Sequence, residues 1–269
     1  MSGQNTPKQH TIAMQDNSKD DSLSSTKASS SLTARIPRSQ RAQFLIQPQP
    51  FGHSVFNAPL LFFPAQIPSP QKGLIIAGTH GDETGSVAAL SAALRSMQPE
   101  HLRHDVVLSL NPDGHQLGTR ANANQVDLNR AFPTKNWSEN GTTYRWTSKN
   151  AQRDVHVATG QKTTLEPEIS AIISLIKTRN PNFVVSLHEP LACVDDPENS
   201  PLGHWLSTYF QLPLVPDIGY DTPGSFGSWC QEQALPCITL ELPNSSPDQL
   251  TINYLESLIS LLQYSGKAA

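Results

Sequence analysis

The chain has 269 residues, a formal net charge of −4 and a pI of about 6.1. That length allows one large domain or two small ones, and the acidic balance argues against a nucleic-acid-binding protein, which would present a basic face. The longest apolar stretch, residues 59–64, is bounded by prolines and too short to cross a bilayer. We therefore expect neither nucleic acid nor a membrane as a partner.

The N-terminal segment differs in composition from the rest of the chain. Residues 1–40 are rich in Ser, Gln, Asn, Lys and Asp, with too few apolar side chains to offset the entropy of ordering, so we expect a disordered tail before a folded domain over 41–269. No hydrophobic segment follows a basic start, as a secretion signal requires. The sparse, odd set of cysteines, Cys193, Cys230 and Cys237, does not indicate a disulfide framework. Together these features predict a cytoplasmic protein.

The first half of the folded part alternates strand and helix patterns. Apolar runs predict strands at 43–46, 60–63, 73–77 and 105–110, and helical spacing of apolar residues predicts a helix over 84–97. The group Asn111-Pro112-Asp113-Gly114 predicts a turn. Residues 116–164 show little periodicity, and we interpret them as a long functional loop region with room for a short helix.

The second half continues the alternation. We expect helices over 165–179 and 248–264, the latter capped by Asp248, and strands over 183–187 and 236–242. This order predicts an α/β fold: a single domain with a mixed, largely parallel central sheet flanked by helices. His80, Asn111 and His188 all follow predicted strands, so they should converge at the edge of the sheet where α/β proteins bind ligands.

Two imidazoles and one carboxylate are the candidate metal ligands. His80 and Glu83 are three residues apart in a loop that leads into a helix, and His188 closes a later apolar run. Such a set leaves one position of a tetrahedral zinc open, as a catalytic zinc requires. Taken singly, the first pair could be a surface ion pair and His188 a hydrogen-bonded structural residue. Glu189 should face away from His188, because successive residues of a strand point to opposite sides.

Other polar residues suggest catalytic roles. Glu241 lies within an apolar strand, where a carboxylate is costly unless it is paired or used. It is either a general base with a raised pKa or an edge-strand residue that points to solvent. Arg120 and Arg130 lie in an amide-rich segment, and arginine can bind a carboxylate or stabilise developing negative charge. A solvated loop is the plainer interpretation of that segment.

Taken together, these residues resemble the zinc carboxypeptidase family, the carboxypeptidase A-like metallopeptidases. That family orders its site as His-x-x-Glu, Arg, Asn-Arg, His and a late Glu. This chain has the same order over residues 73–243: His80, Glu83, Arg120, Asn129, Arg130, His188 and Glu241. Within the family, the stretches 77–83, 111–114, 120–124, 126–130 and 222–230 are most similar to members that hydrolyse murein peptides of the bacterial cell wall.

The resemblance implies specific roles. His80, Glu83 and His188 would bind one Zn²⁺. Glu241 would deprotonate the reactive water and protonate the leaving amine, while Arg120 would polarise the scissile carbonyl. Asn129 and Arg130 would hold the free carboxylate of the released residue. The expected substrate is the small murein peptide L-Ala-γ-D-Glu-meso-diaminopimelate, cut before diaminopimelate during cell-wall peptide recycling.

Two further assignments concern the substrate. Tyr220 is the nearest counterpart of the family's mobile tyrosine, although its offset from the following Gly-Ser is imperfect. Asp221 is a candidate for binding the far end of diaminopimelate, which carries an ammonium and a carboxylate.

Other functions fit part of the pattern. An amino-acid deacylase of the succinylglutamate desuccinylase or aspartoacylase type would share His-x-x-Glu and Asp-Leu-Asn-Arg. A non-catalytic binder of cell-wall peptides would ordinarily lack a ligand or the base. A nucleotide-binding protein would carry a glycine-rich phosphate loop, which does not follow the first strand here.

Overall fold

The computed structural model describes residues 45–147 and 152–266. The tail expected over 1–40, and its boundary with the folded domain, lie outside these residues. Contacts divide the chain into Met1–Leu32 and a second unit, Thr33–Ala269, which carries all the features below.

An eight-stranded mixed sheet organises the second unit, as the sequence predicts. Its order is β1-β2-β4-β3-β7-β10-β8-β9. The central strands β4, β3, β7 and β10 are parallel to one another, whereas β1, β2 and β8 run antiparallel to their inner neighbours. The bounds are β1 Gln49–His53, β2 Pro59–Phe63, β3 Leu74–Ile76, β4 Asp105–Val107, β7 Val184–His188, β8 Leu191–Asp195, β9 Leu214–Val215 and β10 Cys237–Pro243.

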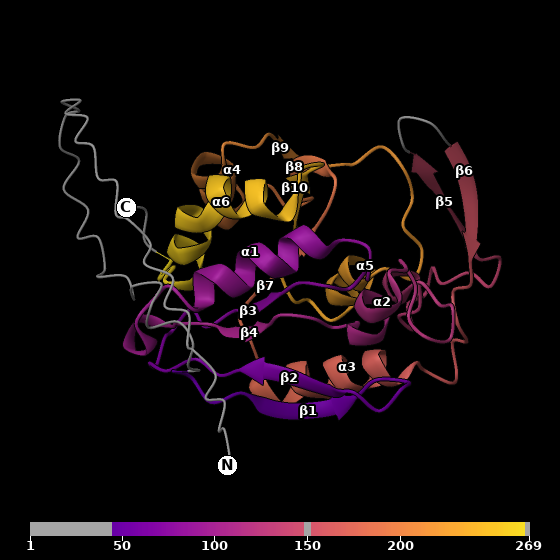
Figure 1. Cartoon of the computed structure of the whole chain (residues 1–269), viewed down its shortest axis with the longest axis horizontal. Helices are drawn as coiled ribbons and strands as arrows, with labels where there is room; N and C mark the ends of the chain where they lie inside the picture. The colour runs from indigo at the N-terminus through magenta and orange to yellow at the C-terminus, as the bar shows by residue number, and fades with distance from the viewer. Residues whose placement is uncertain (1–44, 148–151, 267–269) are drawn as a thin grey trace, which may run out of the picture. The chain divides into compact units, whose positions relative to one another are not determined.

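Helices cover both faces of the sheet (Figure 1). One core joins α1, α4 and α6 to one face, and a second core joins α3 and α5 to the other. The strands serve both cores because successive side chains alternate: Ile75 enters the first core, and Leu74 and Ile76 enter the second. The bounds are α1 Thr84–Leu94, α2 Pro112–Leu117, α3 Pro167–Arg179, α4 Pro201–Phe210, α5 Phe226–Glu232 and α6 Pro247–Leu262.

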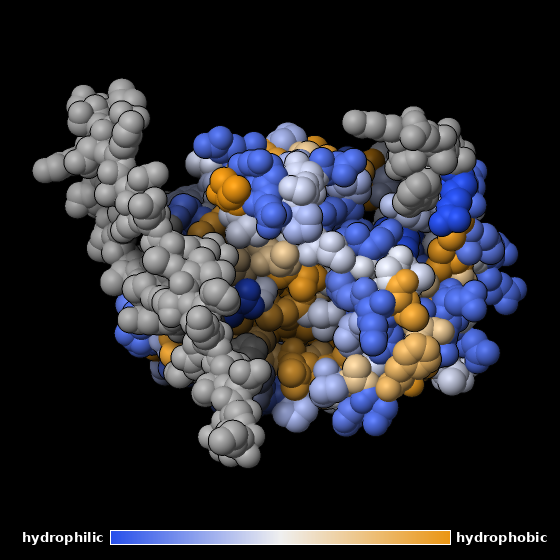
Figure 2. All heavy atoms as spheres, viewed as in Figure 1, coloured by the Kyte–Doolittle hydropathy of each residue, from blue (hydrophilic) through white to orange (hydrophobic). Residues whose placement is uncertain are grey.

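The face in Figure 2 is mostly hydrophilic, with apolar residues gathered near its centre. Within the described residues, no helix has both the length and the apolar character needed to cross a membrane.

Three local predictions are wrong. Of the strand expected over 43–46, residues 43–44 lie outside the described residues and residues 45–46 form a bend, so the first described strand begins at Gln49. Asn111 does not form a plain turn: its side chain accepts a hydrogen bond from the Gly114 N–H at 2.9 Å and caps α2. The same Asn-Pro pair is typical of a helix start, because proline needs no hydrogen-bond partner in the first turn. Ser246, not Asp248, caps α6, and Asp248 lies in its first turn.

The region expected to be a long loop with room for a short helix holds such a helix and, in addition, a hairpin that the sequence pattern did not predict. It contains the short 3₁₀ helix Leu128–Arg130 and an antiparallel hairpin, β5 Thr142–Thr147 with β6 Gln152–Val157. The hairpin lies outside the eight-stranded sheet (Figure 1). Its sequence lacks the apolar alternation of a strand that buries one face in a core, which is why periodicity did not predict it.

Candidate active site

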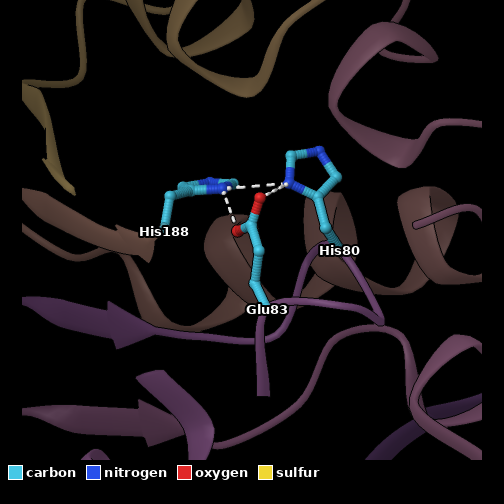
Figure 3. Close-up of side chains that lie close together, drawn as sticks. All are labelled: His80, Glu83 and His188. Carbon is cyan, nitrogen blue, oxygen red and sulfur yellow. Dashed lines mark hydrogen bonds and ion pairs between the residues drawn. The ribbon is translucent and has the colours of Figure 1, made fainter. Parts of the chain in front are cut away.

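His80, Glu83 and His188 meet in one buried cluster (Figure 3). The Glu83 carboxylate lies between the two imidazoles: Oε1 is 2.7 Å from His80 Nδ1, and Oε2 is 3.0 Å from His188 Nδ1. The two Nδ1 atoms are 3.2 Å apart. Their potential ligand atoms all lie within 4.8 Å of one another, so these side chains present three donors to one point.

The backbone that carries His80 and Glu83 makes close contacts. Gly78 has a φ of +67°, and a Cβ there would lie 3.0 Å from the Cα of Ser109. At Gly81 a Cβ would lie 2.1 Å from the carbonyl carbon of Gly114, so only glycine fits. These glycines let the loop after β3 fold against α2. Glu83 stands at the N-cap position of α1 without capping it, which leaves its carboxylate for the histidines.

The outer nitrogen of each imidazole also meets an oxygen atom. His80 Nε2 lies 3.2 Å from Asp127 Oδ1, and His188 Nε2 lies 3.1 Å from Ser186 Oγ. Metal-binding histidines almost always bond through the other ring nitrogen in this way, which fixes ring orientation and tautomer. Two Nδ1 atoms, a carboxylate and two oriented rings fit a zinc ion.

The electrostatics of the cluster favour a cation. Burial and Arg120 lower the pKa of His80, but Glu83 and Asp127 outweigh them and raise it to about 9. Burial raises the pKa of Glu83, yet the two histidines hold it well below its usual range. Positive charge at the imidazoles is thus stabilised by the surrounding carboxylates, as a metal site requires.

Arg120 lies against the cluster and is 16% exposed. It donates from Nη1 to Glu83 Oε1 at 3.1 Å and from Nε to Asp127 Oδ2 at 3.2 Å. Its guanidinium carbon also lies 4.7 Å from the ring centre of Tyr144, on β5. Arg120 is therefore not a solvated loop residue: it is fixed between two buried carboxylates and an aromatic ring.

Glu241 lies beside the cluster because of strand register. β10 pairs in parallel with β7, and Glu241 is opposite His188. β10 is an interior strand between β7 and β8, so Glu241 is not an edge residue facing solvent. Its Oε2 accepts a hydrogen bond from the Leu191 N–H at 3.3 Å. Burial raises the pKa of Glu241, as expected for a group that can accept and return a proton.

A cavity of about 460 Å³ opens in front of the cluster. All three candidate ligands line it, as do the candidate base, the arginines and Tyr220. Asn129 and Arg130 reach it from the 3₁₀ helix Leu128–Arg130. The cavity therefore brings together the proposed metal ligands, base and arginines with two further substrate-binding candidates: His80, Glu83, Arg120, Asn129, Arg130, His188, Tyr220 and Glu241.

The side chains of Asn129 and Arg130 are each held by a hydrogen bond to the backbone. Asn129 Oδ1 accepts a hydrogen bond from the Phe226 N–H at 2.9 Å, which ties the 3₁₀ helix to the start of α5. Arg130 is only 9% exposed, and its Nη1 donates to the carbonyl oxygen of Asn129 at 2.7 Å. This carbonyl is the one hydrogen-bond acceptor of the Arg130 guanidinium among the residues that the structure describes, so the group keeps donors for an anionic ligand.

Comparison with known proteins identifies the family. Residues 51–191 match the model of the zinc carboxypeptidase family. The chain is 62% identical to murein peptide amidase A of Vibrio campbellii over 85% of this chain and 92% of that protein. It is 51% identical to murein peptide amidase A of Escherichia coli K12 over 88% of this chain and 98% of that protein. The chain belongs to the zinc carboxypeptidase family.

Solved structures of the family share the fold. A crystal structure of murein-tripeptide amidase from Escherichia coli O157 superposes with a TM-score of 0.84, at 51% identity, over 88% of this chain and all of that one. Carboxypeptidase A of Helicoverpa armigera gives a TM-score of 0.60 at 16% identity, over 81% of this chain and 68% of that one, which supports the fold alone. The family implies a zinc cofactor and makes this chain a hydrolase.

Tyr220 and Asp221, the two further candidates for binding substrate, differ in whether they line the main cavity. Tyr220 is 54% exposed in the loop between β9 and α5, and it lines the main cavity. Asp221 is exposed and lines a neighbouring hollow instead. Arg120, Arg130 and Tyr220 line both this hollow and the main cavity, so the two adjoin, and the role of Asp221 at the far end of diaminopimelate stays a prediction.

The sequence analysis assigned no role to three residues at the site. They are Asp127, Ser186 and Tyr144, which contact His80, His188 and Arg120 respectively. For two of them, the sequence holds a feature that could have indicated a place at the site. Asp127 stands two residues before Asn129 in the segment that carries the family resemblance, and Ser186 shares a strand face with His188. Tyr144 lies on the hairpin that periodicity did not predict.

Proposed function

We propose that this protein is a zinc-dependent amidase that hydrolyses the bond between γ-D-glutamate and meso-diaminopimelate in the murein tripeptide L-Ala-γ-D-Glu-meso-diaminopimelate. One observation carries the proposal: Glu241 pairs in register with His188, which places a carboxylate of raised pKa beside a three-donor metal cluster. Two relatives named murein peptide amidase A, similar over nearly their whole lengths, support the substrate.

The residues at the site have separate roles in the reaction. One Zn²⁺ held by His80, Glu83 and His188 would supply a Lewis acid to the scissile carbonyl and the attacking water. Glu241 removes a proton from that water and returns it to the amine nitrogen of diaminopimelate as the bond breaks. Asp127 and Ser186 hold the two imidazoles in orientation.

The arginines act on the substrate. Arg120 directs its guanidinium to the carbonyl oxygen, where negative charge grows in the transition state, so its effect falls mainly on turnover. Arg130, with Asn129, binds the free α-carboxylate of diaminopimelate and fixes which bond faces Glu241. Tyr220, at the mouth of the cavity, covers the bound peptide.

The reaction fits the recycling of cell-wall peptides in the bacterial cytoplasm, and we include this in the proposal. Cys193, Cys230 and Cys237 are all unpaired, as is typical of proteins in reducing compartments. Fractionation of the source cells, with the amidase activity assayed in each fraction, tests this compartment.

The decisive experiment incubates the purified protein with L-Ala-γ-D-Glu-meso-diaminopimelate, with and without a chelator, and detects free diaminopimelate by mass spectrometry. We expect release that the chelator abolishes and added zinc restores. Glu241→Gln is the matched control, because it should keep the metal and lose the reaction.

Assays of further substrates distinguish the amidase from a deacylase and from a non-catalytic binder. Release of succinate from N-succinylglutamate, without release of diaminopimelate, would make the protein a deacylase. Binding of the tripeptide without turnover by the zinc-loaded protein would make it a non-catalytic binder.

A further inference from the structure

The cavity floor has two levels along the sheet. At the upper level, His188 of β7, Glu241 of β10 and Cys193 of β8 are register partners. At the lower level, Ser186, Thr239 and Asp195 are partners on the same three strands. Residues two apart on a strand share a face, so Asp195 lies on the catalytic face, one level away from Glu241. Asp195 and Thr239 both line the cavity.

Within the described part of the chain, no cation or hydrogen-bond donor offsets the charge of Asp195. Among the residues that the structure describes, none donates a hydrogen bond to its carboxylate or forms an ion pair with it. The side chain is half-buried, and the charged groups that influence it are Glu241, Asp196 and Asp217, all carboxylates. Burial and these neighbours raise its pKa to about 6. A carboxylate left unpaired in a binding cavity is costly unless a ligand cation pairs with it.

The cavity presents groups of both charges. Arg120 and Arg130 line it, and so does Asp195. Burial and Glu241 raise the pKa of Tyr220, Arg130 and Arg120 lower it, and Asp195 raises it further, so this one side chain lies within electrostatic range of both the arginines and Asp195. The cavity is thus suited to a residue that carries both an anionic and a cationic group.

We propose that Asp195 is a specificity-determining residue that binds the ammonium group at the far end of the released diaminopimelate. This inference rests on the proposed function and names the group that selects its substrate. Arg130 holds the α-carboxylate near the upper level, the scissile nitrogen faces Glu241, and the side chain runs down the face of β10 past Thr239 to Asp195.

The dimensions agree with this placement. Two residues along a strand span about 7 Å. With C–C bonds of about 1.5 Å, the four bonds from the α-carbon of diaminopimelate to its far α-carbon extend over roughly 5 Å, and the attached nitrogen reaches further. An extended diaminopimelate side chain therefore bridges the two levels.

Other nearby carboxylates have different surroundings. Asp196 is buried and accepts hydrogen bonds from the backbone and hydroxyl of Ser200 at the start of α4, each at 2.7 Å. Glu198 lines the cavity but is exposed, and Asp221 lies in the neighbouring hollow. Glu198→Gln and Asp221→Asn are therefore comparison variants, because each removes one other carboxylate near the site without touching Asp195. Loss of the preference for diaminopimelate in Asp221→Asn, with that preference kept in Asp195→Asn, would assign the far amine to Asp221 and overturn the inference.

The test compares two peptides that differ by one group. The first is L-Ala-γ-D-Glu-meso-diaminopimelate, and the second replaces diaminopimelate with L-2-aminopimelate, which keeps the far carboxylate and lacks the far amine. The measured quantity is the ratio of kcat/KM for the two peptides, with wild type, Asp195→Asn and both comparison variants at verified zinc content. Because the reacting bond is the same, the ratio isolates recognition of the far amine.

We expect wild type to prefer the diaminopimelate peptide by at least tenfold, Asp195→Asn to lose most of that preference, and both comparison variants to retain it. An Asp195→Asn enzyme with the wild-type ratio would overturn the inference, as would a wild type that does not distinguish the peptides. If Asp195→Asn does not fold, inhibition of wild type by free meso-diaminopimelate and by free 2-aminopimelate gives the same comparison, and equal inhibition would overturn the inference.

The outcomes also separate this inference from the proposed function. Wild type that cleaves both peptides equally supports the amidase and removes the role of Asp195. Wild type that cleaves neither peptide removes the amidase. In that case, calorimetry measures the affinity of the zinc-loaded protein for each of the two free amino acids. Tighter binding of diaminopimelate than of 2-aminopimelate would support Asp195 as a cation site, and equal binding would remove that role.

Discussion

Asp127 Oδ1 lies 3.2 Å from His80 Nε2, so a buried carboxylate supports the outer face of a candidate metal ligand. The same Asp127 accepts a hydrogen bond from Arg120 Nε and one from the backbone N–H of Asn129 at 2.8 Å. One side chain thereby contacts a proposed metal ligand, the arginine proposed to stabilise the transition state, and the backbone of the segment proposed to bind the substrate carboxylate. The pKa of Asp127 lies well below its usual range, because His80 and Arg120 outweigh the opposing effect of burial.

Asp127→Asn should weaken zinc binding by about 10- to 100-fold, because removing the negative charge leaves the imidazole of His80 less basic and less fixed. Competition with a chromogenic chelator measures the affinity. Asp113→Asn is the control: Asp113 is also buried, but it bonds Ser54 and the backbone of Phe56, away from the cluster. Equal zinc affinity in Asp127→Asn and wild type would contradict the assigned role.

Glu241→Gln should retain zinc and lower kcat by about 10²- to 10⁴-fold, because the amide cannot accept the proton of the attacking water. Metal analysis together with steady-state kinetics checks both parts. His188→Ala should lose metal and turnover together. A Glu241→Gln enzyme with near-normal turnover would refute the choice of base.

Arg130→Lys should raise KM more than it lowers kcat. Lysine keeps the charge but cannot present two parallel donors to a carboxylate, so ground-state binding suffers first. Kinetics on the tripeptide and on its diaminopimelate α-amide separate the two effects. The amide has no α-carboxylate, so the variant and wild type should treat it alike, and a large difference on the amide would argue against this contact.

Preference for diaminopimelate over 2-aminopimelate should fall as the pH drops. Burial, Glu241, Asp196 and Asp217 raise the pKa of Asp195 to about 6, so its negative charge is present above that pH and lost below it. The ammonium of diaminopimelate stays protonated throughout, since aliphatic amines have pKa values near 10. The ratio of kcat/KM for the two peptides should be full near pH 8 and small near pH 5. A constant ratio over this range would contradict the role of Asp195.

A separate pair stabilises the fold away from the site. Arg179, at the end of α3, donates from Nε and Nη2 to the two oxygens of fully buried Asp105, each at 2.9 Å. Arg179→Ala should lower the free energy of unfolding by about 2–3 kcal/mol, because it removes two charged hydrogen bonds from a buried carboxylate, which keeps the Ala65 N–H at 2.9 Å and Lys72 Nζ at 3.7 Å. Urea unfolding measures this, and exposed Lys177→Ala on the same helix should change stability by less than about 0.5 kcal/mol.

Sequence alone determined the strands and helices whose periodicity reflects burial. β3, β7 and β10 are apolar runs because both faces of the central sheet are covered, and α3 and α6 carry apolar residues at helical spacing. The chemistry-bearing residues His80, Glu83, His188 and Glu241 were also evident, because polar groups stand out beside apolar strands and their order matches a known family.

Only the tertiary structure decided what depends on contacts between distant segments. The hairpin that brings Tyr144 to Arg120 carries no periodic signal, since apolar and polar residues do not alternate regularly along its two strands. Asp127 contacts His80 across a separation of 47 residues, so only folding of the intervening chain brings the two together. Asp195 is one of many acids in the sequence, and strand register alone places it on the catalytic face, because pairing between strands fixes which side chains share a surface.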